Sequence, residues 1–373
     1  MEFGAADGYS DVTMERRELL ELARRVLTLP TAPYHEHGVK AFVVEFCCKL
    51  PNVRVEQDRV GNVIARYRSG AAKSPIVFVA HMDHPGFEML GGKRAEFLGG
   101  VPQEMFAKGV GVRVFGANGM QRAKLARFDA SAWPKRKLME LRANGALRKG
   151  DFGMWDVPAF RVAGDKLHAA AIDDVLGTVV MLATLADVSR CRLRTHMWCA
   201  FTRAEEVGFQ GAMALIRTNK IPKAALVVSV EMSKERPWAR IGHGPIVRVG
   251  DRSTVFDPSA TTFLLSVADR CHERESAFHA QRCLMDGGTC EATAFAGFGY
   301  RAGGLCLPLG NYHNIGRDLR PRAEYVSVSD LVQLTKLIVA AAVEWPGSGE
   351  TRAVLRRQML WIARTAPRKL KKI

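Results

Sequence analysis

Two adjacent glutamates raise the first chemical question in this 373-residue sequence. Glu205 and Glu206 lie in the stretch AFTRAEEVGFQGA, where a predicted buried strand meets a predicted helix. A buried carboxylate without a partner is costly and normally takes up a proton. We therefore expect these two acids to be exposed to water or to be neutralised by a cation.

Histidines and acids also follow four other predicted strands. The set consists of His81 and Asp83, Asp173 and Asp174, Glu231, and His313. Sites in open α/β sheets form at the carboxyl ends of the strands, so we expect these side chains to meet. Imidazole and carboxylate ligands suit Zn²⁺, Co²⁺ or Mn²⁺, and no thiolate is placed among them. Two histidines and at least three carboxylates exceed the needs of one zinc ion and predict two metal ions that share a bridging ligand.

The spacing within this set also indicates separate roles. His81 and Asp83 are two residues apart and point the same way along a strand, so Asp83 can orient the imidazole by a hydrogen bond. Glu206 would be neutralised by a metal ion, and Glu205 would face the reacting water. Each residue alone has an ordinary explanation, such as a helix cap at Asp173. Their joint position at strand ends favours a metal site.

The segments that must position these residues alternate between strand and helix patterns. This alternation predicts an α/β sandwich. The predicted strands are 75–80, 194–201, 224–230 and 303–309, and the predicted helices are 174–187, 209–219, 259–275 and 329–344, the last capped by Ser327 or Ser329. Residues 87–166 break the pattern with glycines and short alternating runs, and ANG between two such runs is a hairpin signal. We expect a small β-barrel there, inserted into one catalytic domain formed by residues 1–86 and 167–346.

The amino-acid composition and net charge are those of a globular chain with a basic C-terminal end. Net charge is +16, and eight lysines and arginines fall in the predicted tail, 347–373. Leu355, Met359 and Ile362 share one helical face there. We expect a helix docked on the body, in preference to a nucleic-acid or membrane site. The eight cysteines lack metal-binding spacing, the N-terminal residues lack a signal pattern, and the apolar run VLGTVVMLATLADV is too short to span a bilayer. From these features we expect a cytoplasmic protein whose cysteines are reduced thiols.

Four motifs in order resemble the dinuclear metallo-aminopeptidases of the tetrahedral, or deblocking, type, which are similar to glutamyl and leucyl aminopeptidases. They are AHMD followed by PGF, AIDDVLG, FTRAEEVGFQGA, and GGTCEA followed by PLGNYHN, and the resemblance runs over most of the chain. It implies a zinc-peptidase-like fold with a central mixed sheet flanked by helices. It also implies a cis peptide bond between Asp173 and Asp174, and a homo-oligomer that is dimer-based or dodecameric.

The resemblance further implies the role of each site residue. One metal ion would be held by His81, Asp173 and Glu231, and the other by Asp173, Glu206 and His313. A hydroxide that bridges the ions would attack the first peptide bond, with Glu205 as general base and Asp83 as the group that orients His81. The ions would be zinc, or alternatively cobalt or manganese. The family usually has aspartate in place of Glu231, and the arginine that often precedes the last histidine is absent from the segment 310–312.

Two other functions compete with this reading. A related dinuclear carboxypeptidase or amide deacylase uses the same ligand order, but its extra domain lies between the fourth ligand and the last histidine. Here the irregular region falls between His81 and Asp173, which favours the aminopeptidase. A basic binding module on a retired scaffold would be expected to have lost a ligand, and every ligand type is present.

Overall fold

The computed structural model describes residues 13–347, 356 and 359–364. Its main element is an eight-stranded mixed sheet in the order β1-β2-β12-β3-β13-β16-β14-β15. The strands are β1 (Val53–Gln57), β2 (Val63–Ser69), β3 (Ile76–His81), β12 (Thr195–Thr202), β13 (Leu226–Lys234), β14 (Ile246–Asp251), β15 (Gln281–Met285) and β16 (Arg301–Leu309). The four central strands, β12, β3, β13 and β16, are mutually parallel. Their carboxyl ends therefore lie at one edge of the sheet.

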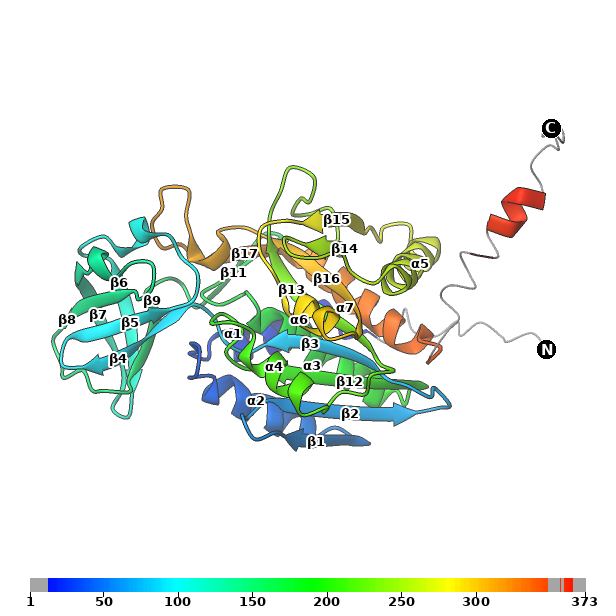
Figure 1. Ribbon diagram of the computed structural model, residues 1–373, viewed down its shortest axis with the longest axis horizontal. Helices are drawn as coiled ribbons and strands as arrows, with labels where there is room; N and C mark the ends of the chain where they lie inside the picture. The colour runs from blue at the N-terminus through cyan, green and yellow to red at the C-terminus, as the bar shows by residue number, and fades with distance from the viewer. Residues whose placement is uncertain (1–12, 348–355, 357–358, 365–373) are drawn as a thin grey trace.

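Helices cover both faces of this sheet (Figure 1). One face packs against α1 (Arg16–Leu27), α2 (His37–Cys48), α3 (Val175–Arg190), α5 (Pro258–Arg274) and α7 (Val328–Glu344), and the other against α4 (Gln210–Arg217) and α6 (Glu291–Gly297). Strand β3 shows why both faces are covered, since Phe78 belongs to the first core whereas Val77 and Val79 belong to the second. Alternate side chains point to opposite faces, so a strand that is apolar throughout needs helices on both sides. The predicted α/β sandwich is confirmed, and Ser327 caps α7 by accepting from Asp330 N.

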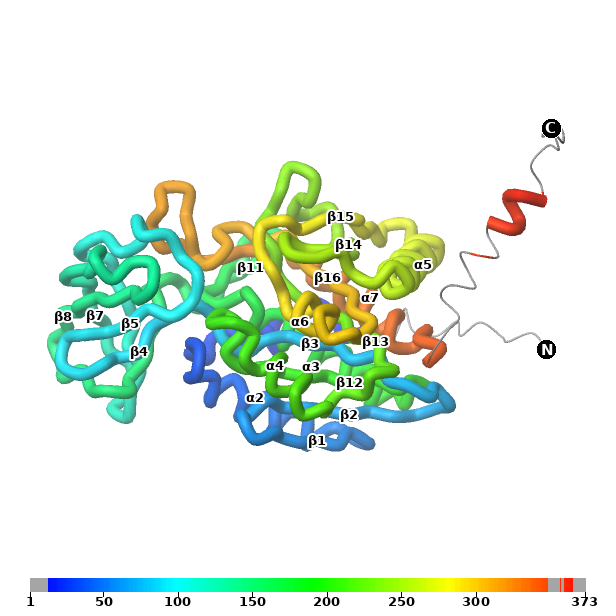
Figure 2. Tube along the Cα trace, in the orientation of Figure 1, coloured from blue at the N-terminus to red at the C-terminus, as the bar shows by residue number. Residues whose placement is uncertain are grey.

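A closed six-stranded barrel forms the other end of the molecule, to the left in Figures 1 and 2. Its strands are β4 (Gly86–Gly91), β5 (Arg94–Leu98), β6 (Gly111–Gly116), β7 (Gly119–Phe128), β8 (Leu138–Ala143) and β9 (Phe152–Trp155). The predicted barrel is confirmed, and so is the ANG hairpin, because Gly116 pairs with Gly119 across it. The barrel core contains Phe97 and Trp155, with ring centroids 5.0 Å apart.

Part of the predicted insert belongs to a different sheet. Strands β10 (Phe160–Ala163) and β11 (Lys166–Ala169) pair with each other and with β17 (Glu324–Ser327). Residues 156–166 of the predicted 87–166 insert therefore lie outside the barrel strands. Alternation of polar and apolar residues marks a strand but does not say which strand it pairs with.

The basic tail is described only at Arg356 and at residues 359–364, which are helical. The predicted docked helix is wrong for these residues, because Met359 is 50% exposed and Ile362 is 45% exposed. All eight cysteines lie in the described part of the chain and are free, and five of them are buried, as expected for core thiols. No helix among the described residues is long and apolar enough to cross a membrane.

Candidate metal centre and active site

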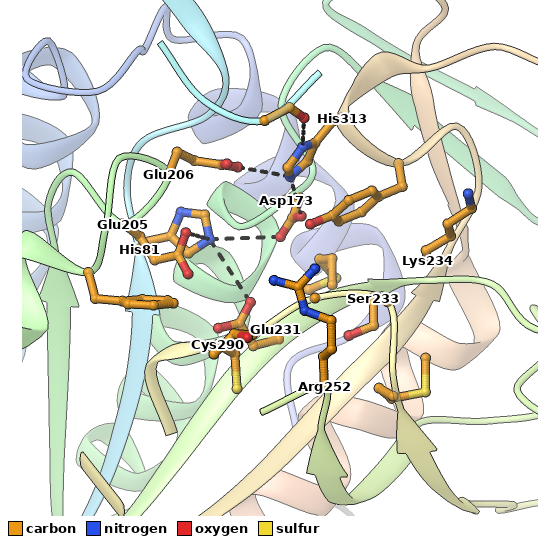
Figure 3. Close-up of a pocket in the computed structure, with 18 of the residues that line it drawn as sticks. His81, Asp173, Glu205, Glu206, Glu231, Ser233, Lys234, Arg252, Cys290 and His313 are labelled. Atoms are coloured by element: carbon orange, nitrogen blue, oxygen red, sulfur yellow. Dashed lines mark hydrogen bonds and ion pairs between the residues drawn. The ribbon is translucent and has the colours of Figure 1, made fainter. Parts of the chain in front are cut away.

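The parallel strands deliver the predicted ligands to one edge of the sheet. His81 is the last residue of β3 and lies opposite Thr202, the last residue of β12. Glu231 lies on the adjacent β13, Asp173 lies two residues before α3, and His313 follows β16. Figure 3 shows these side chains converging with Glu205 and Glu206 in one cavity. All five predicted metal ligands thus come together with the predicted base.

Asp173 lies between the two histidines. Its Oδ1 is 3.8 Å from His81 Nε2, and its Oδ2 is 3.6 Å from His313 Nε2. Glu231 Oε2 is 4.0 Å from the first imidazole nitrogen, and Glu206 Oε1 is 3.2 Å from the second. Each carboxylate oxygen of Asp173 therefore faces a different group of possible ligands. This is the arrangement that a bridging carboxylate requires.

The distal nitrogens of both imidazoles are fixed by carbonyl oxygens. His81 Nδ1 lies 3.1 Å from the backbone oxygen of Asp83, and His313 Nδ1 lies 2.6 Å from that of Gly100. Contacts of this kind select the tautomer that leaves Nε2 free to bind a metal ion. The Asp83 carboxylate is farther from His81, at 3.6 Å, and accepts hydrogen bonds from the backbone N–H groups of Glu205 and Glu206. The Asp83 carboxylate therefore holds the backbone of the glutamate pair and lies beside the imidazole.

The backbone of the paired glutamates is also held from behind. Glu36 is buried, and its carboxylate accepts from Arg203 Nε at 2.7 Å and from Ala204 N at 3.0 Å. Ala204 has a positive φ of 52°, a conformation that L residues seldom adopt without such support. The turn that carries Glu205 and Glu206 is thus held in place by two carboxylates, those of Asp83 and Glu36.

Electrostatics indicate that this cluster needs positive charge. Burial raises the pKa of Glu205 well above its usual value, and burial raises that of Glu231 to about 7. Burial alone would lower the pKa of His81, but Glu205 and Asp83 raise it well above its usual value. Asp173 Oδ1 is buried and has no hydrogen-bond partner among the described residues. Divalent cations would satisfy these oxygens and remove the cost of burying the acids, so the residues present fit a metal centre.

Several supporting residues were not predicted. Glu324 is fully buried and accepts from the backbone N–H groups of Asp173 and His313, which ties two ligands to one carboxylate. His84 donates through Nδ1 to the Asp173 carbonyl and contacts Asn314 Oδ1 through Nε2. In the sequence Glu324 is a single acid in an alternating run, where an exposed position is the ordinary expectation. His84 stands beside the His81 motif, and that position is the one signal that could have identified it.

Glu291 is a second acid that the sequence did not reveal. It is fully buried at the start of α6, and burial raises the pKa of its carboxyl to about 8. The positive charge of His81 acts in the opposite direction and lowers this pKa.

The Asp173–Asp174 peptide bond is cis, as the family resemblance implied.

The histidine–carboxylate cluster lies on one side of a cavity of about 590 Å³. Phe209 and Tyr312 line it beside the cluster, and the Tyr312 ring stacks on His313 with ring centroids 3.8 Å apart. The remaining wall comes from the loops after β14 and before α6 and from the end of β13. A cavity of this size holds one or two amino-acid residues of a peptide beside the reacting groups.

A histidine–carboxylate cluster at the carboxyl ends of parallel strands is an arrangement that suits a metal-dependent hydrolase. The sequence profile of the M42 glutamyl aminopeptidase family matches residues 61–337, and the chain belongs to this family. It is accordingly a metal-dependent aminopeptidase.

Individual relatives are distant but cover nearly the whole chain. A "Putative aminopeptidase" of Acetivibrio thermocellus is 24% identical over 347 residues, covering 88% of this chain and 99% of its own. The TET aminopeptidase of Thaumarchaeota archaeon SCGC AB-539-E09 superposes with a TM-score of 0.75 at 20% identity, covering 91% and 99% of the two chains. The Pyrococcus horikoshii TET1 peptidase, described as assembling into a tetrahedron or a large octahedral shell, gives 0.72 at 21% identity and covers 87% and 99%. At these identities the structural likeness concerns the fold.

Proposed function

We propose that this protein is a dinuclear aminopeptidase that removes N-terminal residues from peptides. The observation that carries the proposal is the position of Asp173, whose two oxygens face the Nε2 atoms of His81 and His313 at 3.8 and 3.6 Å. A carboxylate between two imidazoles, each with a further glutamate beside it, matches two metal ions that share one bridge.

One metal ion would be held by His81, Asp173 and Glu231, and the other by Asp173, Glu206 and His313. Two such ions supply Lewis acidity at the scissile carbonyl and lower the pKa of a water molecule between them. Zinc is the preferred ion, and cobalt or manganese suits the same ligands. The free cysteines support a protein that acts in the cytoplasm, where thiols stay reduced.

Glu205 would act as the general base. Its Oε2 lies 3.9 Å from His81 Nε2, close enough to reach a water molecule within the cluster. Glu205 also lies within reach of a metal ion held by His81 and Glu231. We assign that ligand position to Asp173 because its Oδ1 is slightly closer to His81 and its second oxygen already faces His313. Glu205 would then take a proton from the attacking water and deliver it to the leaving amine.

The competing assignment is a carboxypeptidase or amide deacylase. The position of the barrel supports the aminopeptidase instead. Strands β4–β9 are inserted between His81 and Asp173, and the chain from Glu231 to His313 contributes β14, α5, β15, α6 and β16 to the main domain. A lid domain between the last two ligands, typical of that other group, has no counterpart in the described residues.

Substrates with blocked ends test this proposal. The purified protein, loaded with Zn²⁺, Co²⁺ or Mn²⁺, is offered a panel of peptides with a free amino end, an acetylated amino end or an amidated carboxyl end. We expect release of the first residue from free-amine peptides, with or without an amidated carboxyl end, and no cleavage after acetylation. Cleavage confined to acetylated peptides, or to peptides with a free carboxyl end, would overturn the aminopeptidase assignment.

A further inference from the structure

Tyr312 places a phenol hydroxyl in the cavity beside the histidine–carboxylate cluster. Its ring stacks on the imidazole of His313, with an angle of 21° between the two planes. A Cβ atom built on Gly288 would lie 3.7 Å from Tyr312 Oη, and the loop that carries Gly288 also lines the cavity. The hydroxyl therefore extends from the last candidate metal ligand toward the loop 287–289.

This hydroxyl is a hydrogen-bond donor that the fold leaves unused. Tyr312 is half-buried in the cavity wall, and its hydroxyl has no hydrogen-bond partner among the described residues. By contrast, Tyr300 Oη donates to the carbonyl oxygen of Ile221 at 3.0 Å. A tyrosine hydroxyl that is removed from bulk water usually finds such a partner. The Tyr312 hydroxyl is therefore available to a ligand in the cavity.

The same hydroxyl lies close to the acids of the cluster. Burial raises the pKa of Tyr312, and Asp173 has the largest effect among the four acids that raise it further, ahead of Glu206, Glu205 and Glu231. Asp173 is the residue that faces both imidazoles, so the hydroxyl lies near the middle of the cluster. A phenol carries its proton at neutral pH in any case, so this group can donate a hydrogen bond there.

The turn around Tyr312 has a backbone conformation that L residues seldom adopt. Asn311 has a φ of 54°, and His313 has a φ of 55°. Both are tied to the neighbouring chain, because Asn311 Nδ2 donates to the carbonyl oxygen of Ala323 at 2.8 Å and His313 N donates to Glu324 Oε1 at 2.8 Å. Strained residues persist where the surroundings fix them, and they are frequent at functional sites. The turn thus fixes the direction in which the Tyr312 side chain points.

We propose that the Tyr312 hydroxyl donates a hydrogen bond to the oxygen of the scissile carbonyl and stabilises the negative charge that develops on it. This inference rests on the proposed aminopeptidase function and adds a catalytic residue to it. The attacking water gives a proton to Glu205 and bonds to the carbonyl carbon, so the π electrons of the carbonyl move onto its oxygen. When the C–N bond breaks, these electrons form the carbonyl again, and the proton passes from Glu205 to the leaving amine. Tyr312 keeps its own proton throughout and acts only as a fixed donor.

Tyr312→Phe tests the hydroxyl alone, because phenylalanine keeps the ring that stacks on His313. The substrate is whichever of alanyl, leucyl and glutamyl p-nitroanilide the metal-loaded wild type cleaves fastest. We expect kcat to fall by about 10- to 100-fold, the range of a hydrogen bond to a charged group. KM, the bound metal and the melting temperature should stay nearly unchanged, since the bond forms only as charge develops. Tyr300→Phe, which removes a hydroxyl outside the cavity wall, is the matched control and should keep the wild-type kcat.

Binding of a tetrahedral anion gives a second measurement that does not depend on turnover. The aminophosphonic acid with the side chain of the chosen substrate has charged oxygens in the tetrahedral arrangement of the intermediate. Its Kd for the metal-loaded protein is measured by calorimetry. Tyr312→Phe should raise this Kd by a factor similar to its loss in kcat, and Tyr300→Phe should leave it unchanged.

Three results would overturn this inference and leave the aminopeptidase function in place. The first is a Tyr312→Phe variant with wild-type kcat and unchanged affinity for the phosphonic acid. The second is a loss of bound metal together with kcat, which would show that Tyr312 only holds His313. Arg252 also extends toward the cluster (Figure 3), so the third is a fall in kcat at constant KM that occurs in Arg252→Gln and not in Tyr312→Phe. Failure of the metal-loaded wild type to cleave any free-amine substrate would instead refute the proposed function itself.

Discussion

The separate roles of the two adjacent glutamates can be tested by one isosteric substitution at each position. Glu205→Gln keeps the size of the side chain and a hydrogen-bonding end, but it removes the ability to accept a proton. Glu205 Oε2 lies 3.9 Å from His81 Nε2, whereas Glu206 Oε1 lies 3.2 Å from His313 Nε2. Both glutamates are within reach of a metal ion, so substitution at each position, and not distance, separates the proposed base from the proposed ligand.

The expected effect of Glu205→Gln is a loss of catalysis with the metal retained. General acid–base catalysis contributes about 10²- to 10⁴-fold, which corresponds to about 3–5.5 kcal/mol in the activation free energy. We expect kcat to fall by at least this factor, with KM and thermal stability nearly unchanged. The Asp83 carboxylate bonds to the backbone N–H of Glu205, so the loop should keep its position.

The assay combines steady-state kinetics with metal analysis of both variants. Glu205→Gln should retain about two metal ions per chain. Glu206→Gln should lose affinity for the ion near His313, and stability and activity should fall together. Excess metal should restore part of the activity of Glu206→Gln and none of that of Glu205→Gln. An empty metal site in Glu205→Gln with full occupancy in Glu206→Gln would reverse the roles, and full activity in both would refute the mechanism.

Three further predictions concern stability and assembly. Glu36→Ala removes the buried partner of Arg203 and should lower the free energy of unfolding by about 3–5 kcal/mol in urea titrations. The exposed control Glu21→Ala should change this free energy by less than about 1 kcal/mol. Equal effects of the two variants would contradict the argument. Asp187 accepts a hydrogen bond from Met14 N, and burial raises its pKa from 3.8 to about 7. Between these two pH values the folded state binds more protons than the unfolded chain. The free energy of unfolding therefore falls as the pH rises through this range. Asp187→Asn removes this term, so its stability gain over wild type should grow between pH 4 and 8 toward an upper limit of about 4 kcal/mol, and a gain independent of pH would refute the assignment. We also expect the protein to sediment as a homo-oligomer at micromolar concentration, as its resemblance to the tetrahedral aminopeptidases implies, and a monomeric mass would contradict this expectation.

The positions of the candidate metal ligands could be predicted because they depend on the local order of residues in the sequence. A parallel strand that is apolar throughout must be covered on both faces, and its polar residue at the carboxyl end must then lie at the edge of the sheet. His81 after β3 and Glu231 near the end of β13 follow this rule. The hairpin that closes at Gly119 was also predictable from local sequence, because Gly119 has a φ of 90°, a conformation that glycine adopts more readily than other residues.

The residues that the sequence did not reveal act across the fold. Glu324 reaches Asp173 and His313 from another sheet, over 151 and 11 residues of sequence. The strands after the barrel pair with β17 near the end of the chain, a partner that no local pattern indicates. The positively charged residues of the cavity wall could not be predicted for the same reason. Lys234 and Arg252 belong to separate strand ends that only the sheet order brings together.

Metal titration tests the central claim most directly. The protein is stripped with a chelator, its residual metal is measured by mass spectrometry, and Zn²⁺, Co²⁺ or Mn²⁺ is returned in steps while activity on an N-terminally free peptide is followed. A dinuclear centre with Asp173 as its bridge predicts that the stripped protein is inactive and less stable to heat. It also predicts that activity rises to a plateau only as the second equivalent per chain binds, and that Asp173→Asn loses both binding steps. Full activity without metal, or a plateau at one equivalent, would contradict the account.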